Sequence, residues 1–199
     1  MGVEDDLDPP LRVDWLDAEE LADGRPGRLG LTFLPGKRGP SMRYPGRVYR
    51  RDLARDLETL RLVGVRAVIL LVEDHELVRW GDPEIVDRAR MAGIAIDRHP
   101  IPDGSAPRSA DAMDAILGGL DLARADGDAV VACMGGVGRA GTVAACALVA
   151  AGSSAAGAIA RVRAVRHPTA VETAGQVAFV EAYERHIAER GHPSARVSP

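Results

Sequence analysis

Short apolar runs alternate along the chain with longer segments in which hydrophobic residues recur at every third or fourth position. A short apolar run that ends at turn residues is typical of a strand buried on both faces of a sheet, whereas the recurring pattern is typical of an amphipathic helix. The runs predict strands at residues 29–34, 66–72, 94–99 and 128–133. The recurring pattern predicts helices at residues 51–63, 82–92, 109–125, 139–151, 154–166 and 172–189.

The order of these elements predicts the fold class. Because strands alternate with helices, we expect a single α/β domain with a mainly parallel central sheet flanked by helices on both faces. Neither an internal repeat nor a linker divides the chain. We expect an acidic, partly irregular N-terminal segment at residues 1–28, the folded domain at residues 29–190 and a flexible tail at residues 191–199.

Composition and charge narrow the function classes. Of the 199 residues, 46% are hydrophobic and 27% are charged, which is the balance of a globular protein. The net charge of −4 gives no basic surplus for nucleic acid, and no apolar run is long enough to cross a membrane. We therefore expect neither a nucleic-acid nor a membrane partner. Two cysteines are too few for a disulfide scaffold, so we expect a reducing, cytoplasmic location.

The most informative stretch is VVACMGGVGRAGT at residues 130–142. A predicted buried strand delivers Cys133 to a glycine-rich loop, which closes at Arg139 on the first turn of a predicted helix. Glycines let successive backbone N–H groups turn inward as an anion-binding nest, and the helix N-terminus adds partial positive charge that favours a thiolate. Arg139, six positions after Cys133, can grip two phosphate oxygens. The stretch predicts a phosphoryl-transfer site.

Other interpretations of this loop are weaker. A cysteine and an arginine at this spacing occur by chance in many proteins, as a buried thiol beside a surface arginine. A glycine-rich loop can also bind a nucleotide, but this one lacks the Gly-Lys-Ser/Thr ending and the spacing of a dinucleotide fingerprint. The second cysteine, Cys146, falls on the apolar face of its helix and is expected in the core. Five scattered histidines offer no metal-ligand spacing, so no metal site is expected.

A leaving alkoxide or phenoxide needs a proton, and Asp103 is the candidate donor. It lies in the segment IPDGSAP at residues 101–107, after a predicted strand and before a candidate hinge at Gly104. Loops that follow parallel strands emerge at one edge of the sheet, so the loops of Asp103 and Cys133 are expected to meet. Asp103 would donate a proton in a first step and activate water in a second. Without the Cys133 loop, Asp103 would be interpreted as an ordinary aspartate of a turn.

Several segments, in order from about Leu34 to Phe179, resemble one enzyme family. They are LPG (34–36), RDLARDLETL (51–60), GVRAVILLVEDHEL (64–77), PIPDGSAP (100–107), CMGGVGRAGTVAAC (133–146), AIARVRAVR (158–166) and ETAGQ (172–176). Through them the chain resembles the dual-specificity protein phosphatases, a division of the protein-tyrosine phosphatase family. The resemblance is strongest to the branch around cyclin-dependent kinase inhibitor 3, the kinase-associated phosphatase. It implies the cysteine-phosphatase fold.

The resemblance also implies the chemistry. Such enzymes form a cysteinyl-phosphate intermediate and hydrolyse it without a metal or organic cofactor. Cys133 would be the nucleophile, Arg139 the phosphate clamp and Asp103 the general acid. The substrate would be a phosphorylated protein, on tyrosine and also on serine or threonine, or a small phosphomonoester. The phosphate would lie on the backbone amides of Met134, Gly135, Gly136, Val137, Gly138 and Arg139.

Two positions depart from the family pattern. The family has histidine before the cysteine and serine or threonine after the arginine, where this chain has Ala132 and Ala140. The histidine supports the thiolate, and the hydroxyl stabilises the cysteine as it leaves phosphorus. The loss of one charge-assisted hydrogen bond costs about 1.5–3 kcal/mol, so we expect a slower second step. Thr142 is an accessory candidate to replace the hydroxyl. Gln176 is an accessory candidate to orient water, although a lone glutamine on a helix is more often exposed.

Three functional hypotheses remain. The first is an active phosphatase for phosphomonoesters. The second is a pseudophosphatase that binds phosphorylated partners with little turnover, although a binding module needs neither Cys133 nor Asp103. The third is a different thiol enzyme, such as a sulfur transferase, against which Asp103 and the extent of the resemblance argue.

Overall fold

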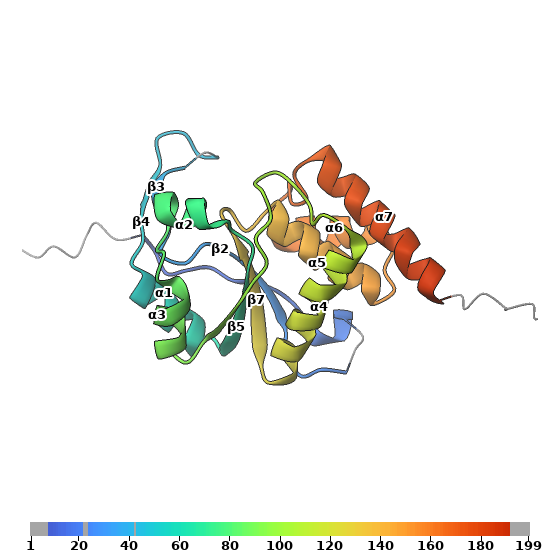
Figure 1. The fold of residues 1–199 in the computed structure, drawn as a ribbon, viewed down its shortest axis with the longest axis horizontal. Helices are drawn as coiled ribbons and strands as arrows, with labels where there is room; N and C mark the ends of the chain where they lie inside the picture. Colours follow the sequence, from blue (N-terminus) through green and yellow to red (C-terminus); the bar gives the residue numbers. More distant parts are fainter. Residues whose placement is uncertain (1–7, 22–23, 42, 192–199) are drawn as a thin grey trace, which may run out of the picture.

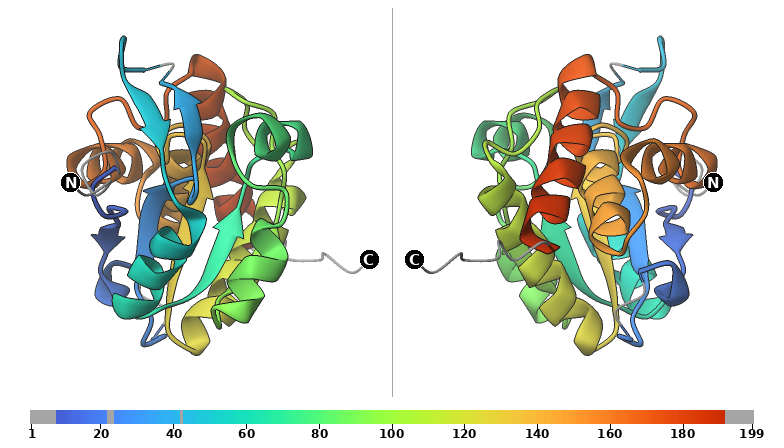
Figure 2. Two further views of the ribbon diagram at one scale, coloured as in Figure 1. Left: turned by 90° about the vertical axis from the view of Figure 1, so that its left-hand side faces the viewer. Right: turned by 90° about the vertical axis from the view of Figure 1, so that its right-hand side faces the viewer.

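The computed structural model describes residues 8–21, 24–41 and 43–191, and its centre is a five-stranded sheet. The strands lie in the spatial order β1 (Asp14–Leu16), β2 (Leu29–Phe33), β7 (Asp128–Cys133), β5 (Val65–Leu70) and β6 (Ala95–Arg98). Strand β1 runs antiparallel to β2, and the other three pairings are parallel. A separate hairpin of β3 (Arg38–Pro40) and β4 (Val48–Arg50) projects beyond the carboxyl edge of the sheet (Figure 2).

The helices form a layer on each face of this sheet (Figure 1). One layer contains α1 (Leu53–Leu62), α2 (Asp74–Trp80) and α3 (Ile85–Met91). The other contains α4 (Ala110–Ala125), α5 (Arg139–Ala150), α6 (Ala155–Val165) and α7 (Ala174–Gly191). The predicted α/β domain with a mainly parallel sheet is confirmed. Within the described residues, no helix combines the length and the apolar character that a membrane span requires.

Strand β7 shows why an apolar run folds as a central strand. Val131 and Cys133 belong to the hydrophobic core on the α4–α7 side, whereas Val130 and Ala132 belong to the core on the α1–α3 side. Both faces of the strand are therefore buried, and no polar alternation is needed. The strand ends at Cys133, between the ends of β2 and β5.

Helix α5 fixes the position of the loop that precedes it. Its residues from Arg139 to Val149 are all buried, and it packs against α4, α6 and α7. The close approach depends on small residues: a β-carbon on Gly141 would lie 3.1 Å from the backbone nitrogen of Val171. A helix held on all sides gives its first turn, and hence Arg139, a fixed location.

The N-terminal region has more structure than the sequence predicted. Residues 8–21 include β1 and a short 3₁₀ helix, η1 (Ala18–Leu21), and β1 completes one edge of the central sheet. Acidic residues of this segment are paired with α6 and its C-terminal cap, Asp14 with Arg166 and Glu20 with Arg161. The predicted tail lies outside the described residues from position 192 onward.

Candidate active site

Four loops meet at the carboxyl edge of the sheet, because the strands that precede them are parallel. They follow β2, β5, β6 and β7, and they bring Lys37, Glu76, Asp103 and the loop after Cys133 together. A pocket of about 440 Å³ opens between them and the β3–β4 hairpin. The expected meeting of the Asp103 and Cys133 loops is therefore observed.

Cys133 is the last residue of β7 and directly precedes the loop that lines this pocket. It is 3% exposed, and its Sγ accepts a hydrogen bond from the backbone N–H of Gly136 at 3.2 Å. Gly136 has a φ of 66°, and a β-carbon there would lie 2.4 Å from the carbonyl oxygen of Thr32. Only glycine fits this conformation without displacing β2. The loop is thereby turned back over the sulfur.

The carbonyl groups of the loop all make contacts with surrounding protein groups. Their donors are Lys37 Nζ for Met134 (3.2 Å), Arg166 Nη2 for Gly135 (3.2 Å), Arg166 Nε for Gly136 (2.9 Å), Val171 N for Val137 (3.2 Å), and Thr142 N and Oγ1 for Gly138 (both 2.9 Å). In a trans peptide the N–H of the next residue points away from the carbonyl. The amides of residues 135–139 are therefore turned away from these donors, and the amide of Gly136 reaches the thiol.

Arg139 is held from two sides. Its Nη1 and Nη2 lie 2.6 and 2.8 Å from the carboxylate oxygens of Glu76, and Nη1 also donates to the carbonyl oxygen of Ile101 at 2.9 Å. Burial acts to raise the pKa of Glu76, but hydrogen bonds from Arg139 and from the backbone of Glu73 hold that pKa below its usual range. Both members of the pair are therefore charged, and the guanidinium is fixed in orientation.

Asp103 reaches the same guanidinium from the solvent side. Its Oδ1 lies 2.9 Å from Nη2 of Arg139, although the side chain is 81% exposed. The backbone of its loop is fixed by the Thr173 hydroxyl, which donates to the carbonyl oxygen of Gly104 at 3.0 Å. The three predicted catalytic residues are thus brought together, with Arg139 between the loops of the other two.

Gln176, the accessory candidate on α7, is buried rather than exposed. Its Nε2 donates to the carbonyl oxygen of Ser105 at 2.9 Å, and its Oε1 accepts from the backbone nitrogens of Glu172 and Thr173 at 2.8 and 3.3 Å. The side chain is buried because α7 begins against the loop: a β-carbon on Gly138 would lie 3.1 Å from Nε2. Gln176 therefore links the segment before α7 to the Asp103 loop.

The segment before α7 also carries backbone strain. Val171 has a φ of 59°, which a β-branched residue rarely adopts, and its N–H is bonded to the carbonyl of Val137. Such strain persists only where surrounding contacts determine the conformation. The glycine-rich loop at residues 134–138, proposed below as a phosphate loop, and the Asp103 loop are therefore tied to one rigid segment.

The other accessory candidate and the two departures lie close to Arg139. The hydroxyl of Thr142 donates to the carbonyl oxygen of Gly138 at 2.9 Å and so stabilises the first turn of α5. Ala132 and Ala140 are completely buried. Neither position offers a polar group to the site.

Glu76, Lys37 and Arg166 belong to the site and were not found from the sequence. Glu76 and Lys37 each follow the end of a predicted buried strand, which was the available signal. Arg166 carried no such signal, because it lies at the far end of α6. It is paired with Asp14 at 2.6 Å and supports the loop through the carbonyls of residues 135 and 136.

One group of possible metal ligands exists in the described part of the chain. It consists of Asp111, Asp114 and His186, on α4 and α7. Asp114 already accepts a hydrogen bond from Tyr183 at 2.7 Å and forms an ion pair with Arg190. Its charge is met by protein groups, so the cluster does not call for an ion.

Comparison with known proteins gives the family. The family model described as cyclin-dependent kinase inhibitor 3 matches residues 2–160. This chain belongs to that family. It is 28% identical to cyclin-dependent kinase inhibitor 3 of Sus scrofa over 197 residues, which cover 98% of this chain and 87% of the relative. It is 26% identical to the Homo sapiens protein over 200 residues, which cover 98% and 90%.

Solved structures show the same fold. Kinase-associated phosphatase with its catalytic-site cysteine replaced by serine gives a TM-score of 0.78 at 26% identity, and the match covers 90% of this chain and 97% of that one. Tk-PTP in its active form gives 0.64 at 30% identity, with coverage of 82% and 93%. The predicted dual-specificity phosphatase fold is confirmed.

Proposed function

We propose that this member of the cyclin-dependent kinase inhibitor 3 family is a cysteine-dependent phosphatase that hydrolyses phosphomonoesters through a cysteinyl-phosphate intermediate. The observation that carries the proposal is the phosphate loop, whose carbonyls are all bound by surrounding donors while the amides of residues 135–139 turn the other way. Amides gathered beside a thiol and a guanidinium suit a phosphate dianion.

In the first step, the phosphoryl oxygens would rest on these amides and on Arg139. The thiolate of Cys133 would attack phosphorus; the S–P bond forms as the P–O bond to the leaving group breaks. Asp103 would give its proton to the departing oxygen. The contact of 2.9 Å between Asp103 and Arg139 shows that the two side chains already reach the same point.

In the second step, water would attack phosphorus of the intermediate. The carboxylate of Asp103 would take the proton from water, and the S–P bond would break to release inorganic phosphate and the thiolate. The departing sulfur is assisted by the amide of Gly136 at 3.2 Å, but by no hydroxyl at Ala140. This is the step that we expect to limit turnover.

The surroundings of the site favour phosphorylated side chains of proteins as substrates. Phe33, Tyr49 and Trp80 line the pocket and offer apolar walls to an aromatic or aliphatic side chain. The relatives are named for a cyclin-dependent kinase, which also favours a protein substrate. We infer phosphotyrosine as the main substrate, with phosphoserine and phosphothreonine as further ones.

The deciding experiment is stopped-flow hydrolysis of p-nitrophenyl phosphate by the wild type, Cys133→Ser and Cys146→Ser. Cys146 is the matched control, because it is the other cysteine and lies in the core, where burial raises its pKa. We expect a burst of nitrophenol followed by slower turnover in the wild type and in Cys146→Ser, and neither in Cys133→Ser.

Two results of this experiment would contradict the proposal. If the wild type shows neither burst nor turnover across about pH 5 to 8 yet still binds inorganic phosphate, the enzyme proposal is wrong and the pseudophosphatase hypothesis replaces it. Retention of the burst in Cys133→Ser would exclude the cysteine as nucleophile.

A further inference from the structure

The chain contains a single lysine. Of its 25 lysine and arginine residues, 24 are arginine, and the exception is Lys37. On the surface of a globular protein, lysine and arginine both serve solubility. The location of the single lysine is therefore informative. Lys37 follows β2 at the carboxyl edge of the sheet and lines the pocket of the candidate site.

Lys37 is a buried cation without an acidic partner. The residue is 8% exposed; its Nζ donates to the carbonyl oxygen of Met134 at 3.2 Å and lies 4.2 Å from the centre of the Tyr49 ring. Among the described residues, no carboxylate forms an ion pair with it. A lysine is rarely buried unless it is paired, because the desolvated ammonium is costly. Arg139, the expected phosphate clamp, is already neutralised by Glu76, and Arg166 is paired with Asp14.

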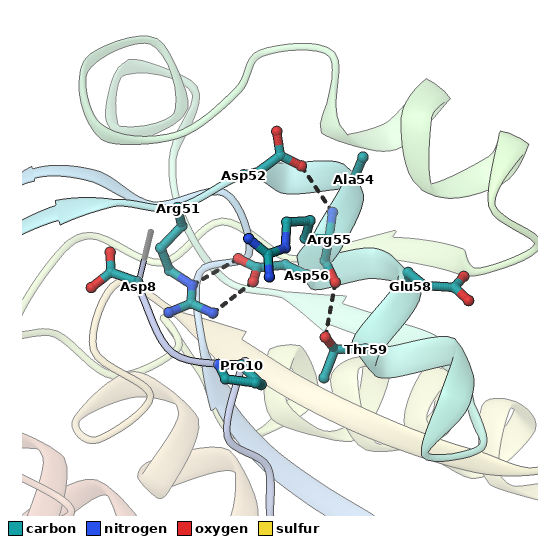
Figure 3. A pocket seen from close by; sticks show the side chains of 9 residues that line it. All are labelled: Asp8, Pro10, Arg51, Asp52, Ala54, Arg55, Asp56, Glu58 and Thr59. Carbon is teal, nitrogen blue, oxygen red and sulfur yellow. Dashed lines mark hydrogen bonds and ion pairs between the residues drawn. The ribbon is translucent and has the colours of Figure 1, made fainter. Parts of the chain in front are cut away.

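A buried ion pair lies in a second pocket (Figure 3) and is bonded to the turn that carries Lys37. Arg51 and Asp56 face each other there, with contacts of 2.6 and 2.8 Å. Asp56 accepts from the backbone nitrogen of Gly36 at 2.8 Å, and the backbone nitrogen of Arg51 donates to the carbonyl oxygen of Lys37 at 3.1 Å. The ammonium is therefore positioned by its surroundings rather than free to move into solvent.

The charges around Lys37 are those of the candidate site. Burial lowers its pKa, and the positive charges of Arg43 and Arg47 lower it further, whereas the negative charges of Cys133 and Asp103 act to raise it. An additional anion in the pocket would supply the missing opposite charge. Lys37 Nζ binds the carbonyl of Met134, the residue directly after Cys133, and the charge of Cys133 acts on the pKa of Lys37. The ammonium and the thiol therefore lie close together.

We propose that Lys37 is a further cation of the phosphate site, and that it stabilises the negative charge on Cys133 and on the phosphoryl group bound beside it. The ligand class is a phosphomonoester dianion or inorganic phosphate. This inference rests on the proposed phosphatase function, since it assigns an anion to the loop that follows Cys133. It adds a residue from the β2 edge to a site otherwise built from α5 and the loops after β5, β6 and β7.

A single lysine allows a direct test. Reductive methylation with ¹³C-formaldehyde labels only Lys37 and the chain's amino terminus and retains the positive charge, and the Lys37→Met variant identifies which NMR signal belongs to Lys37. Inorganic phosphate is then added at constant ionic strength, and the signal is followed against pH. We expect phosphate to shift the Lys37 signal and to raise the pKa of Lys37, because a bound anion favours the protonated form.

Two variants supply a second readout that does not depend on turnover. Bound phosphate should protect Cys133 from alkylation by iodoacetamide, and the degree of protection would measure binding. We expect Lys37→Met to weaken phosphate binding roughly 10- to 100-fold and to move the alkylation curve of Cys133 to higher pH, and Lys37→Arg to retain most of both. Thermal unfolding establishes that each variant is folded. If Lys37→Met does not fold, Lys37→Arg, which also removes the labelled amine, assigns the Lys37 signal of the wild type.

The outcomes separate this inference from the proposed function. If phosphate protects Cys133 but leaves the Lys37 signal and its pKa unchanged, Lys37 is only a structural residue and the inference is wrong, while the phosphatase proposal stands. If phosphate neither binds nor is released from a substrate, both fail. If phosphate binds and shifts Lys37 but no substrate is hydrolysed, Lys37 is a phosphate ligand in a pseudophosphatase.

Discussion

Glu76 and Arg139 form a bidentate ion pair, with contacts of 2.6 and 2.8 Å, inside the protein. Glu76 comes from the first turn of α2 and Arg139 from the first turn of α5, so the pair joins the two helical layers across the end of the sheet. It fixes the plane of the guanidinium before any phosphate arrives. In the proposed function, preorganisation of this kind would remove a cost otherwise met when phosphate binds.

Replacement of Glu76 by glutamine should therefore lower both stability and phosphate affinity. Glutamine would leave the buried guanidinium of Arg139 without the negative charge of its α2 partner. This loss should lower the free energy of unfolding by about 3–5 kcal/mol. Urea unfolding measures this loss. Glu58→Gln is the control, because Glu58 pairs with Arg61 on the exposed face of α1, and we expect it to leave stability nearly unchanged.

The pH dependence of the Glu76→Gln effect follows from the lowered pKa of Glu76. The contribution of this carboxylate to stability is fully present above its unfolded pKa of about 4.3 and is lost as the pH falls through the lower folded pKa. The difference in unfolding free energy between wild type and Glu76→Gln should thus be constant near neutral pH and shrink in acid. A difference that grew in acid would contradict the assigned ion pair.

The sequence was sufficient for the elements with strong patterns. The apolar run at residues 128–133 and the small-residue segment after it identified β7, the phosphate loop and α5 with nearly correct ends. The strands β1, β3 and β4 have three residues each, too few for any periodicity, and they were missed. Helix α2 has seven residues and no apolar repeat, so it was missed as well.

The site was predicted where its residues adjoin in sequence or follow a strand of the parallel sheet. Cys133 and Arg139 share one loop, and Asp103 was found because a parallel sheet gathers its loops at one edge. Glu76 and Gln176 act through partners that are 63 and 71 positions away, Arg139 and Ser105. Such pairings arise from the packing of loops on one another, which no local pattern records.

Two adjacent glycines in the phosphate loop should respond differently to alanine. A β-carbon at Gly136 would lie 2.4 Å from the carbonyl oxygen of Thr32 and 2.6 Å from Nη2 of Arg166, whereas one at Gly135 would meet nothing closer than 4.0 Å. Gly136 also has a positive φ. We expect Gly136→Ala to lower kcat/KM at least about 100-fold, since the loop amides would be displaced.

Gly135→Ala is the matched control and should stay within a few-fold of the wild type. Steady-state hydrolysis of p-nitrophenyl phosphate and thermal unfolding of both variants provide the comparison. Equal losses in the two variants would mean that the orientation of the Gly136 peptide does not decide phosphate binding.

Gln176→Glu should impair general acid catalysis more than binding. The new carboxylate can still accept from the backbone of Glu172, but it cannot donate to the carbonyl oxygen of Ser105, and the two oxygens would repel each other. The loop of Asp103 would move, and phenyl phosphate, a poor leaving group, would lose about 100-fold in kcat. p-Nitrophenyl phosphate, whose leaving group needs little protonation, should lose much less.

This leaving-group difference separates a positioning role from a general loss of structure. The exposed Glu181 lies on the same helix, and Glu181→Gln should change neither substrate. If Gln176→Glu slows both substrates equally, Gln176 supports the fold or the phosphate loop rather than the position of Asp103.

Ala140→Ser should speed the release of phosphate from the enzyme. Ala140 is buried in the first turn of α5, directly after Arg139, and adds no hydroxyl near the sulfur of Cys133. A serine there would offer a hydrogen bond to the departing thiolate, worth about 1.5–3 kcal/mol, and the steady-state rate should rise roughly 10-fold or more. The burst should keep its rate, because the first step does not break the S–P bond.

Ala144→Ser is the control: it places the same hydroxyl one turn further along the buried helix and should give no gain. An unchanged steady-state rate in a folded Ala140→Ser would show that breakdown of the intermediate is not limited at this position.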